Sequence, residues 1–379
     1  MEGREFSLIR QFKDVNDPRI DRRKAHKLID IIVTAICAVV GGADGFDAIV
    51  IFGKAHQKWF EKFLELPNGI PSHDTFARVF ARINPQEFRT CFAKWTKEIA
   101  GIFEDVIALD GQTLCGARRA GQKKSAIHIV SAWAAGLRLV LAQTAVAEKS
   151  NEITAIPEVL KILDIKGCIV TMDAMGCQQK HTQQIINQEG DYVIGLKGNQ
   201  GTTLTAVEEH FATTPETDFK KCTDTDKGHG RIETRTYFAA NASEIRDLKE
   251  WPGLKSAIKV VSTREINDIT TTETRYYISS IENSLVSRAS SAIRSHWGIE
   301  NSLHYVLDVT FHQDRSRIRK NHAPENFGVL RHIAMNILRG APFAKKSSPS
   351  NNLKRIRAAA DTEYLAEIMR GTGLENSSI

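Results

Sequence analysis

Two aspartates that each follow an apolar run are the residues of this chain best suited to chemistry. Residues 106–109 are apolar and lead directly to Asp110, and the largely apolar residues 168–172 lead to Asp173. Apolar runs of this length indicate buried strands. A buried carboxylate without a partner costs free energy, so each aspartate must meet a cation or lie at an open end of a sheet.

Converging aspartates would form a site for a divalent cation. A cation between two adjacent carboxylates relieves their repulsion, and ligand sets made only of oxygen favour Mg²⁺ or Mn²⁺ over Zn²⁺. We therefore expect Mg²⁺, with Mn²⁺ as a substitute. Two such ions about 3.5–4 Å apart activate water and stabilise the leaving oxygen in phosphodiester cleavage, and a freed 3′-hydroxyl can then attack a second strand at the same site.

A third acid is expected from a helix that packs beside the two strands. We select Glu300, because its neighbours Ile299 and Leu303 mark the apolar face of that helix. Asp308, which lies two turns further along, and Asp314 are alternatives for the same position.

The elements that must position these acids follow the order of three strands, helix, strand, helix and strand. Strands are expected over residues 106–113, 126–134, 137–145, 168–172 and 192–196, with helices over residues 153–163 and 178–188. The first three strands are predicted to form an antiparallel meander. This order matches the ribonuclease H-like core, an α/β fold with a mixed sheet flanked by helices. In that topology the first and fourth strands are neighbours, which brings Asp110 and Asp173 together.

The remaining chain divides into modules around this core. Residues 1–100 are predicted to be an all-helical module for DNA binding or for packing, with helices over 28–40, 46–63, 72–83 and 85–99. Residues 101–200 form the first part of the core. Residues 201–286 form a β-rich insertion, with strands near 231–239, 255–264 and 271–281. Residues 287–340 return to the core with the helix that carries the third acid, and residues 341–379 form a basic C-terminal tail.

The composition is that of a globular protein with a mild basic bias. The chain has 379 residues, a net charge of +6 and a pI of about 8.9, which suits a nucleic-acid partner without requiring one. Its six cysteines form no C-x-x-C pair and are expected to be reduced thiols of a cytoplasmic protein. The apolar run at residues 31–40 is shorter than the roughly 20 residues that span a bilayer, so we expect a soluble protein.

Basic side chains gather towards the C-terminal end. Between Gln313 and Arg357 there are eleven lysines and arginines but only two acids, Asp314 and Glu325. This bias favours a phosphate-binding surface over an ordinary solvated face. The DNA contacts expected from this run are Arg315, Arg317, Arg319 and Lys320.

Further DNA contacts are expected near the three acids. Lys197 and Asn199 follow a strand that should end beside the second aspartate, and they either touch DNA or form a turn. Arg294, His296 and Trp297 precede the third acid on its helix. Trp297 either stacks on an unpaired base or packs as a core residue.

Segments spread through most of the chain resemble the H-repeat-associated, ISAs1-type transposases of bacterial insertion sequences, within the IS4-like DDE group. They are GIPSHDTFARVF (69–80), ALDGQT (108–113), MDAMGCQ (172–178), YVIGLKGNQ (192–200), GHGRIETR (228–235) and HWGIENSLHYVLDVTFHQD (296–314). The resemblance implies a DDE triad at Asp110, Asp173 and Glu300 on a ribonuclease H-like domain with a β-strand insertion. It implies Mg²⁺-dependent cleavage and joining of double-stranded DNA at element ends in the bacterial cytoplasm. Because two ends are joined, it also implies a homodimer or larger assembly.

The sequence departs from the wider group around the third acid. That group carries a YxxRxxxExxxxxxK signature, whose positions here hold Ile293, His296, Glu300 and Leu307. Only the glutamate is retained, so the contacts of the tyrosine, arginine and lysine do not transfer to this chain. Two alternatives to a transposase remain open: a nuclease of the same fold that cleaves without joining, and a catalytically silent or domesticated DNA-binding relic.

Overall fold

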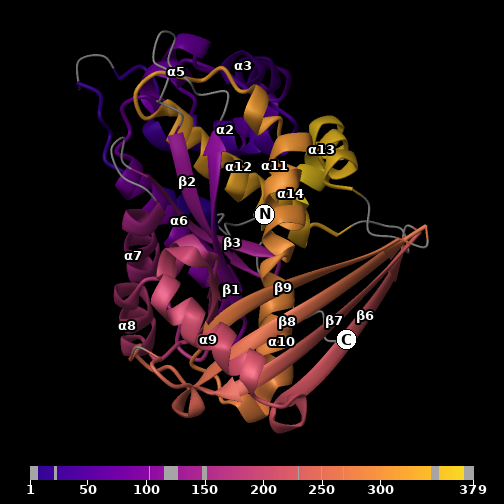
Figure 1. Cartoon of the computed structure of the whole chain (residues 1–379). Coiled ribbons are helices and arrows are strands. Elements are labelled where there is room, and N and C mark those ends of the chain that lie inside the picture. Colours follow the sequence, from indigo (N-terminus) through magenta and orange to yellow (C-terminus); the bar gives the residue numbers. More distant parts are fainter. Residues whose placement is uncertain are drawn as a thin grey trace.

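The computed structural model describes residues 7–20, 24–101, 103–114, 127–146, 152–228, 230–248, 250–267, 269–342 and 350–370. Within these residues the strands are β1 (Val106–Leu114), β2 (Ile127–Ala134), β3 (Leu139–Ala145), β4 (Ile169–Met172), β5 (Asp191–Leu196), β6 (Lys220–Gly228), β7 (Arg231–Asn241), β8 (Ser256–Ile266) and β9 (Ile269–Ser279). They form one mixed sheet in the order β3-β2-β1-β4-β5-β9-β8-β7-β6, with helices packed on its β1–β5 half (Figure 1). The predicted α/β class, a mixed sheet flanked by helices, is confirmed.

The five core strands have the predicted connectivity. β1 pairs antiparallel with β2, and β2 pairs antiparallel with β3, so the meander is confirmed. On the other side of β1, β4 runs parallel to it, and β5 runs parallel to β4. The helix α7 (Glu152–Ile162) leads from β3 to β4, and α8 (Gln179–Asn187) connects β4 to β5. The strand that holds Asp110 at its middle, β1, and the strand that ends before Asp173, β4, are therefore neighbours.

The side chains of β1 alternate between two hydrophobic layers. Ile107 and Leu109 pack with residues of α7, whereas Ala108 belongs to the layer that contains α12 (Ala323–Gly340). Because successive side chains of a strand point to opposite faces, Asp110 faces the same layer as Ala108. The helix α10 (Val286–His296) packs on β1 and β4 from that side and is followed by α11 (Tyr305–Val309).

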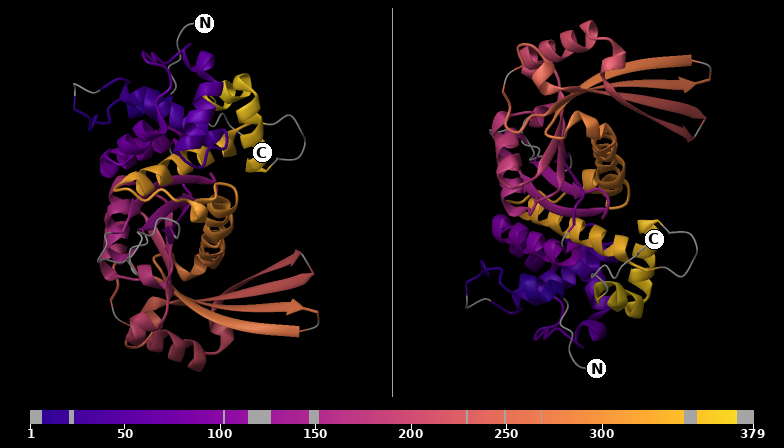
Figure 2. Two further views of the ribbon diagram at one scale, coloured as in Figure 1. Left: turned by 90° about the horizontal axis from the view of Figure 1, so that it is seen from above. Right: turned by 90° about the horizontal axis from the view of Figure 1, so that it is seen from below.

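The insertion extends the core sheet instead of forming a separate one. β9 pairs antiparallel with β5, and β8, β7 and β6 follow as antiparallel neighbours, so the four strands project from the body as an arm (Figure 2). The helix α9 (Gly201–Thr213) precedes this arm. Strands β7, β8 and β9 were predicted, but β6 was missed. β6 has the sequence KKCTDTDKG and is exposed along most of its length at the sheet edge, so no apolar alternation marks it.

The N-terminal helices share a hydrophobic core with the layer that contains α12. They are α1 (Ser7–Phe12), α2 (Leu28–Val40), α3 (Phe46–Ala55), α4 (Gln57–Phe60), α5 (His73–Phe80) and α6 (Pro85–Ala100). α2 is buried along almost its whole length and packs on α12. The prediction of one helix over residues 46–63 is wrong, because α3 ends at Ala55 and a separate short α4 follows His56. None of the described helices is both long and apolar enough to cross a membrane.

The C-terminal helices α13 (Asn351–Ala360) and α14 (Thr362–Arg370) fasten the chain end to this core. Arg355 is buried, pairs with Asp44 at 3.0 Å and donates a hydrogen bond to the backbone oxygen of Thr310. Its guanidinium lies 4.5 Å from the centre of the Phe311 ring. The other oxygen of Asp44 lies 2.7 Å from Nδ1 of His312. Asp44 therefore joins the N-terminal helices, α13 and the segment that follows α11.

A side chain of α12 pairs with the outer backbone edge of β3, the first strand of the sheet. Asn336 accepts a hydrogen bond from the Val140 amide at 2.9 Å and donates one to the Val140 oxygen at 2.8 Å. The hydroxyl of Thr96 on α6 donates to the Leu141 oxygen at 2.7 Å. These contacts satisfy backbone groups that a neighbouring strand would otherwise pair, which protects the edge from association with another chain.

We expect Asn336→Leu to lower the free energy of unfolding by about 2–4 kcal/mol, because it leaves two buried backbone groups unpaired. The measurement is chemical denaturation of the whole chain. The matched control is Asn187→Leu, since Asn187 is exposed at the end of α8 and its replacement should change stability by less than about 0.5 kcal/mol. Equal midpoints for the two variants would contradict the role of Asn336.

Candidate active site

Asp110 lies on β1 and faces the side of the sheet on which α10 and α12 pack. Its Oδ1 accepts a hydrogen bond from the Gly111 amide at 2.9 Å, and its side chain is 18% exposed. The pKa of Asp110 is raised to about 7, chiefly by burial and also by the negative charges of Glu300, Asp173 and Glu152, against the opposing effect of the Gly111 hydrogen bond. An anion at this position therefore costs free energy unless a cation joins it.

Asp173 follows β4 and caps the short 3₁₀ turn at Ala174–Gly176. Its Oδ1 accepts hydrogen bonds from the amides of Met175 at 2.9 Å and Gly176 at 3.2 Å. The side chain is exposed and lines the same cavity as Asp110 and Glu300, with a volume of about 530 Å³. Asn199 braces this turn, since its side-chain amide donates to the Ala174 oxygen at 2.6 Å.

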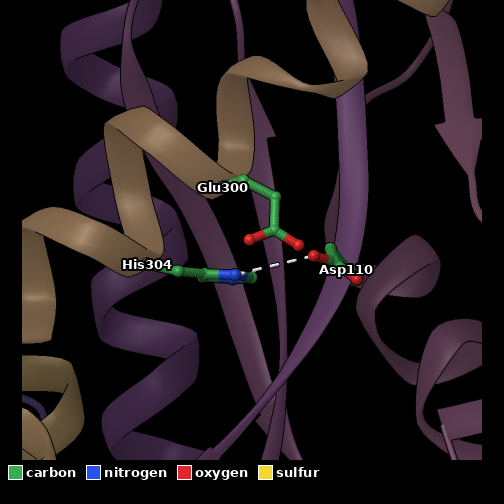
Figure 3. A group of neighbouring side chains, drawn as sticks. All are labelled: Asp110, Glu300 and His304. Carbon is green, nitrogen blue, oxygen red and sulfur yellow. Dashed lines mark ion pairs between the residues drawn. The ribbon is translucent and has the colours of Figure 1, made fainter. Parts of the chain in front are cut away.

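Glu300 begins a π-helical turn, Glu300–His304, between α10 and α11. Single π turns within α-helices are frequent at functional sites. Glu300, Asp110 and His304 each bring one potential ligand atom within 4.8 Å of the others, and their side chains point toward one another (Figure 3). Asp173 lines the shared cavity but is outside this close group.

The two alternative third acids lie elsewhere. Asp308 accepts a hydrogen bond at 2.8 Å from the side-chain amide of Gln112, two residues beyond Asp110 on β1. Burial raises the pKa of Asp308 to about 6, with a further contribution from the charge of Asp314. Asp314 is exposed, and neither acid belongs to the close group around Asp110. The geometry therefore favours Glu300.

Two histidines flank Glu300 at four residues on either side. Nδ1 of His296 lies 3.0 Å from the Thr171 hydroxyl on β4, and His296 lines the cavity. Nδ1 of His304 lies 3.6 Å from Oδ2 of Asp110. Burial lowers the pKa of both rings to about 4, and the neighbouring His296 contributes to the shift at His304. Both imidazoles are therefore neutral at pH 7.

His304 is a residue that the sequence analysis missed. The available signal was its spacing, since a side chain four residues beyond Glu300 on a helix lies on the same face.

Trp297 is 44% exposed, so its alternative interpretation as a core residue is wrong. The guanidinium of Arg275 on β9 lies 4.4 Å from the centre of its ring. Both residues line the first cavity and also a second one of about 400 Å³ against β7 and β8. The two cavities therefore adjoin along the base of the arm.

The predicted DNA contacts differ in their surroundings. Lys197 is exposed and lines the first cavity, whereas Asn199 supports the turn after Asp173. Arg294 lines the second cavity and forms an ion pair with Asp226 on β6. Whether these side chains touch DNA stays a prediction.

The interpretation of residues 313–357 as one basic surface is wrong for several of its members. Arg331, Lys354 and Arg355 are buried, and Arg339 packs on the ring of Trp133 and donates to backbone oxygens. Within the tail predicted for residues 341–379, the described helices are thus partly core. Arg315, Arg317, Arg319 and Lys320 are exposed.

Comparison with known proteins identifies the family. A family model described as "Transposase DDE domain" matches residues 101–337, and one described as "DDE_Tnp_1-associated" matches residues 9–96. The chain is 40% identical to the H repeat-associated putative transposase YhhI of Escherichia coli K12, over 97% of this chain and 98% of that protein. It is 38% identical to the putative transposase YncI of Escherichia coli O157:H7, over 96% and 94% of the two chains.

Among solved structures, a piggyBac transposase synaptic complex with hairpin DNA aligns over 99% of this chain and 78% of that chain, with a TM-score of 0.40 and 10% sequence identity. The family models and the relatives define the class: the chain belongs to the DDE transposase family. The resemblance to the H-repeat-associated transposases is thereby confirmed.

We expect Asp110→Asn to stabilise the metal-free protein at pH 8 by about 2–4 kcal/mol, and by about 1 kcal/mol or less at pH 4.5. The raised pKa means that the folded state binds more protons than the unfolded state between about pH 4 and 7. The free energy of unfolding of the unaltered protein therefore falls as the pH rises through that window. The neutral amide of Asp110→Asn removes the cost of ionising a buried carboxyl group. The measurement is denaturant unfolding in EDTA at both pH values.

A divalent cation should make the unaltered protein more stable than Asp110→Asn at pH 8. Addition of Mn²⁺ at pH 8 should raise the melting temperature of the unaltered protein and leave that of Asp110→Asn unchanged. If Asp110→Asn were destabilising to the same extent at both pH values, the electrostatic account of Asp110 would be wrong.

Proposed function

We propose that this chain is the DNA transposase of a bacterial insertion sequence, which hydrolyses phosphodiester bonds at the element ends and then transfers the freed strands to target DNA. The catalytic groups are Asp110, Asp173 and Glu300. The observation that carries the proposal is that these carboxylates, from β1, the end of β4 and the helix that crosses them, line one cavity. The strand order β3-β2-β1-β4-β5 supports a ribonuclease H-like core.

The residues present suit a divalent metal ion. The carboxylates of Asp110, Asp173 and Glu300 line the cavity, and the pKa of Asp110 is raised by burial and by the charges of its neighbours. Asp110, which is flanked by both other acids, would hold the metal with each of them. Mg²⁺, or Mn²⁺ in its place, would supply a lowered pKa for the attacking water and neutralise the charge that develops on the leaving oxygen.

The residues around the acids would hold and orient the DNA. Lys197 and Arg275 line the cavity and can bind phosphate oxygens, and His296 offers a neutral imidazole beside Asp173. Arg294 lies in the adjoining second cavity. Exposed cations beyond α11, which include Arg317, would bind the duplex that leaves the site.

In this proposal the modules have separate tasks. Residues 101–200 and 287–340 supply the catalytic core, and residues 201–286 form a wall of the DNA channel. The helices within residues 1–100 chiefly support the core, because their hydrophobic residues are continuous with it. Joining two element ends requires at least a dimer of this chain with double-stranded DNA.

We expect Trp297→Ala to weaken binding of DNA ends that carry unpaired bases by about 5- to 150-fold, because stacking of one base on an aromatic ring contributes about 1–3 kcal/mol. Binding of fully paired duplex should change little. The control is Tyr305→Ala, since Tyr305 is 63% exposed and lines neither cavity. Fluorescence anisotropy with the two DNA types measures the difference, and equal effects of the two variants would argue against stacking.

The function itself is tested by strand transfer with pre-cut element ends. The unaltered protein should nick intact ends and join pre-cut ends when Mg²⁺ is present. Asp110→Asn and Glu300→Gln should lower both rates by at least about 10³-fold while DNA binding stays near normal. Asp308→Asn should retain both activities, since Asp308 is bound to Gln112 instead of the metal group.

Hydrolysis without joining would instead identify a nuclease of the same fold. Binding without either reaction would identify a catalytically silent relic. Nicking by Asp110→Asn at the unaltered rate would show that the triad assignment is wrong.

A further inference from the structure

We infer that the metal ion held between Asp110 and Glu300 is also bound by Nδ1 of His304, which makes this position a mixed oxygen–nitrogen site that prefers Mn²⁺ to Mg²⁺. The inference rests on the proposed function and refines it. In the proposed function the protein ligands of the metal are carboxylate oxygens only. In this inference they are two carboxylates and one imidazole nitrogen.

The distances are those of ligands that share one cation. Nδ1 of His304 lies 3.6 Å from Oδ2 of Asp110, and potential ligand atoms of Asp110, Glu300 and His304 all lie within 4.8 Å of one another. Two ligands bound at about 2.1 Å to one ion are separated by roughly 3 Å at right angles and roughly 4 Å when opposite. The group therefore needs only small side-chain adjustments to close on an ion.

The surroundings of the His304 ring point to a ligand. The residue is 8% exposed, and its Nε2 is buried without a hydrogen-bond partner in the described part of the chain. The separation of 3.6 Å from Asp110 is too long for a hydrogen bond. In a neutral ring with its proton on Nε2, the lone pair of Nδ1 faces carboxylate oxygens, and a cation bound between them would relieve that repulsion.

The helix geometry directs His304 and Glu300 at the same point. Both belong to the π turn Glu300–His304, and their side chains approach Asp110 from the same side (Figure 3). His296, four residues before Glu300, differs. Its Nδ1 has the Thr171 hydroxyl as a partner at 3.0 Å, and it is not part of the close group. The two histidines therefore form a matched pair for an experiment.

A nitrogen ligand changes the metal preference. Mg²⁺ favours oxygen donors and keeps much of its water, whereas imidazole strengthens the binding of divalent transition metals. We expect the unaltered protein to bind Mn²⁺ about tenfold or more tightly than Mg²⁺, and this ratio to fall when the nitrogen donor is replaced by oxygen.

The experiment is pulsed electron paramagnetic resonance of Mn²⁺ bound to the full chain without DNA. Coupling to a ¹⁴N nucleus should be present in the unaltered protein and in His296→Asn. It should be lost in His304→Asn, whose side-chain oxygen can occupy the place of Nδ1. The affinity of His304→Asn for Mn²⁺ should fall by about 10- to 100-fold, with a smaller change for Mg²⁺.

The outcomes separate this inference from the proposed function. Mn²⁺ that binds in an Asp110-dependent way but shows no ¹⁴N coupling in the unaltered protein would overturn the role of His304 and leave the triad intact. Coupling that is lost in His296→Asn but kept in His304→Asn would also overturn it. Binding of Mn²⁺ that is unchanged in Asp110→Asn would refute the proposed metal site itself. The result on the unaltered protein decides the inference even if His304→Asn fails to fold.

Discussion

Burial of the Asp110 carboxylate beside other acids is the constraint on which the rest of this structure depends. Asp110 is partly buried on the central strand β1, and the charges of Glu300, Asp173 and Glu152 all oppose its ionisation. Such an arrangement is unfavourable without a bound cation, so the fold must hold the acids in place by other contacts. The sheet, the helix that crosses it and the C-terminal helices supply those contacts.

The sheet, the turn after β4 and the helix that carries Glu300 meet around Asp110. Parallel pairing sets β4 beside β1, and hydrogen bonds from the turn after β4 fix the Asp173 carboxylate. The helix that carries Glu300 packs into the core that the N-terminal helices and α12 share. Arg355 holds the end of that helix through Thr310 and Phe311 and is itself paired with Asp44. The N-terminal region thereby contributes to the position of the third acid without contacting it in any described interaction.

Much of the core could be predicted from the sequence because its signals are local. Apolar runs marked β1, β4 and β5, and the strand order then predicted which strands would be neighbours. Asp110 and Glu300 lie close together as expected. The edge strand β6 could not be found in this way, because its polar residues are stabilised by pairing with β7 and not by burial.

Features that depend on tertiary contacts were beyond the sequence analysis. Lys354 and Arg355 belong to a basic run, yet they are buried, because backbone oxygens and Asp44 accept their hydrogen bonds. The ring of Trp297 lies against Arg275 of the arm, and the approach of His304 to Asp110 depends on the π turn. The contact of Trp297 with the arm has no signature in composition or periodicity, and the only sequence signal for His304 is its spacing of four residues from Glu300.

The most direct test of this account is a crystal structure of the protein soaked in Mn²⁺, with anomalous diffraction data to locate the ion. The account predicts an anomalous peak about 2.0–2.4 Å from carboxylate oxygens of both Asp110 and Glu300. An anomalous map with no peak beside Asp110, at a Mn²⁺ concentration that fills sites elsewhere on the protein, would contradict it.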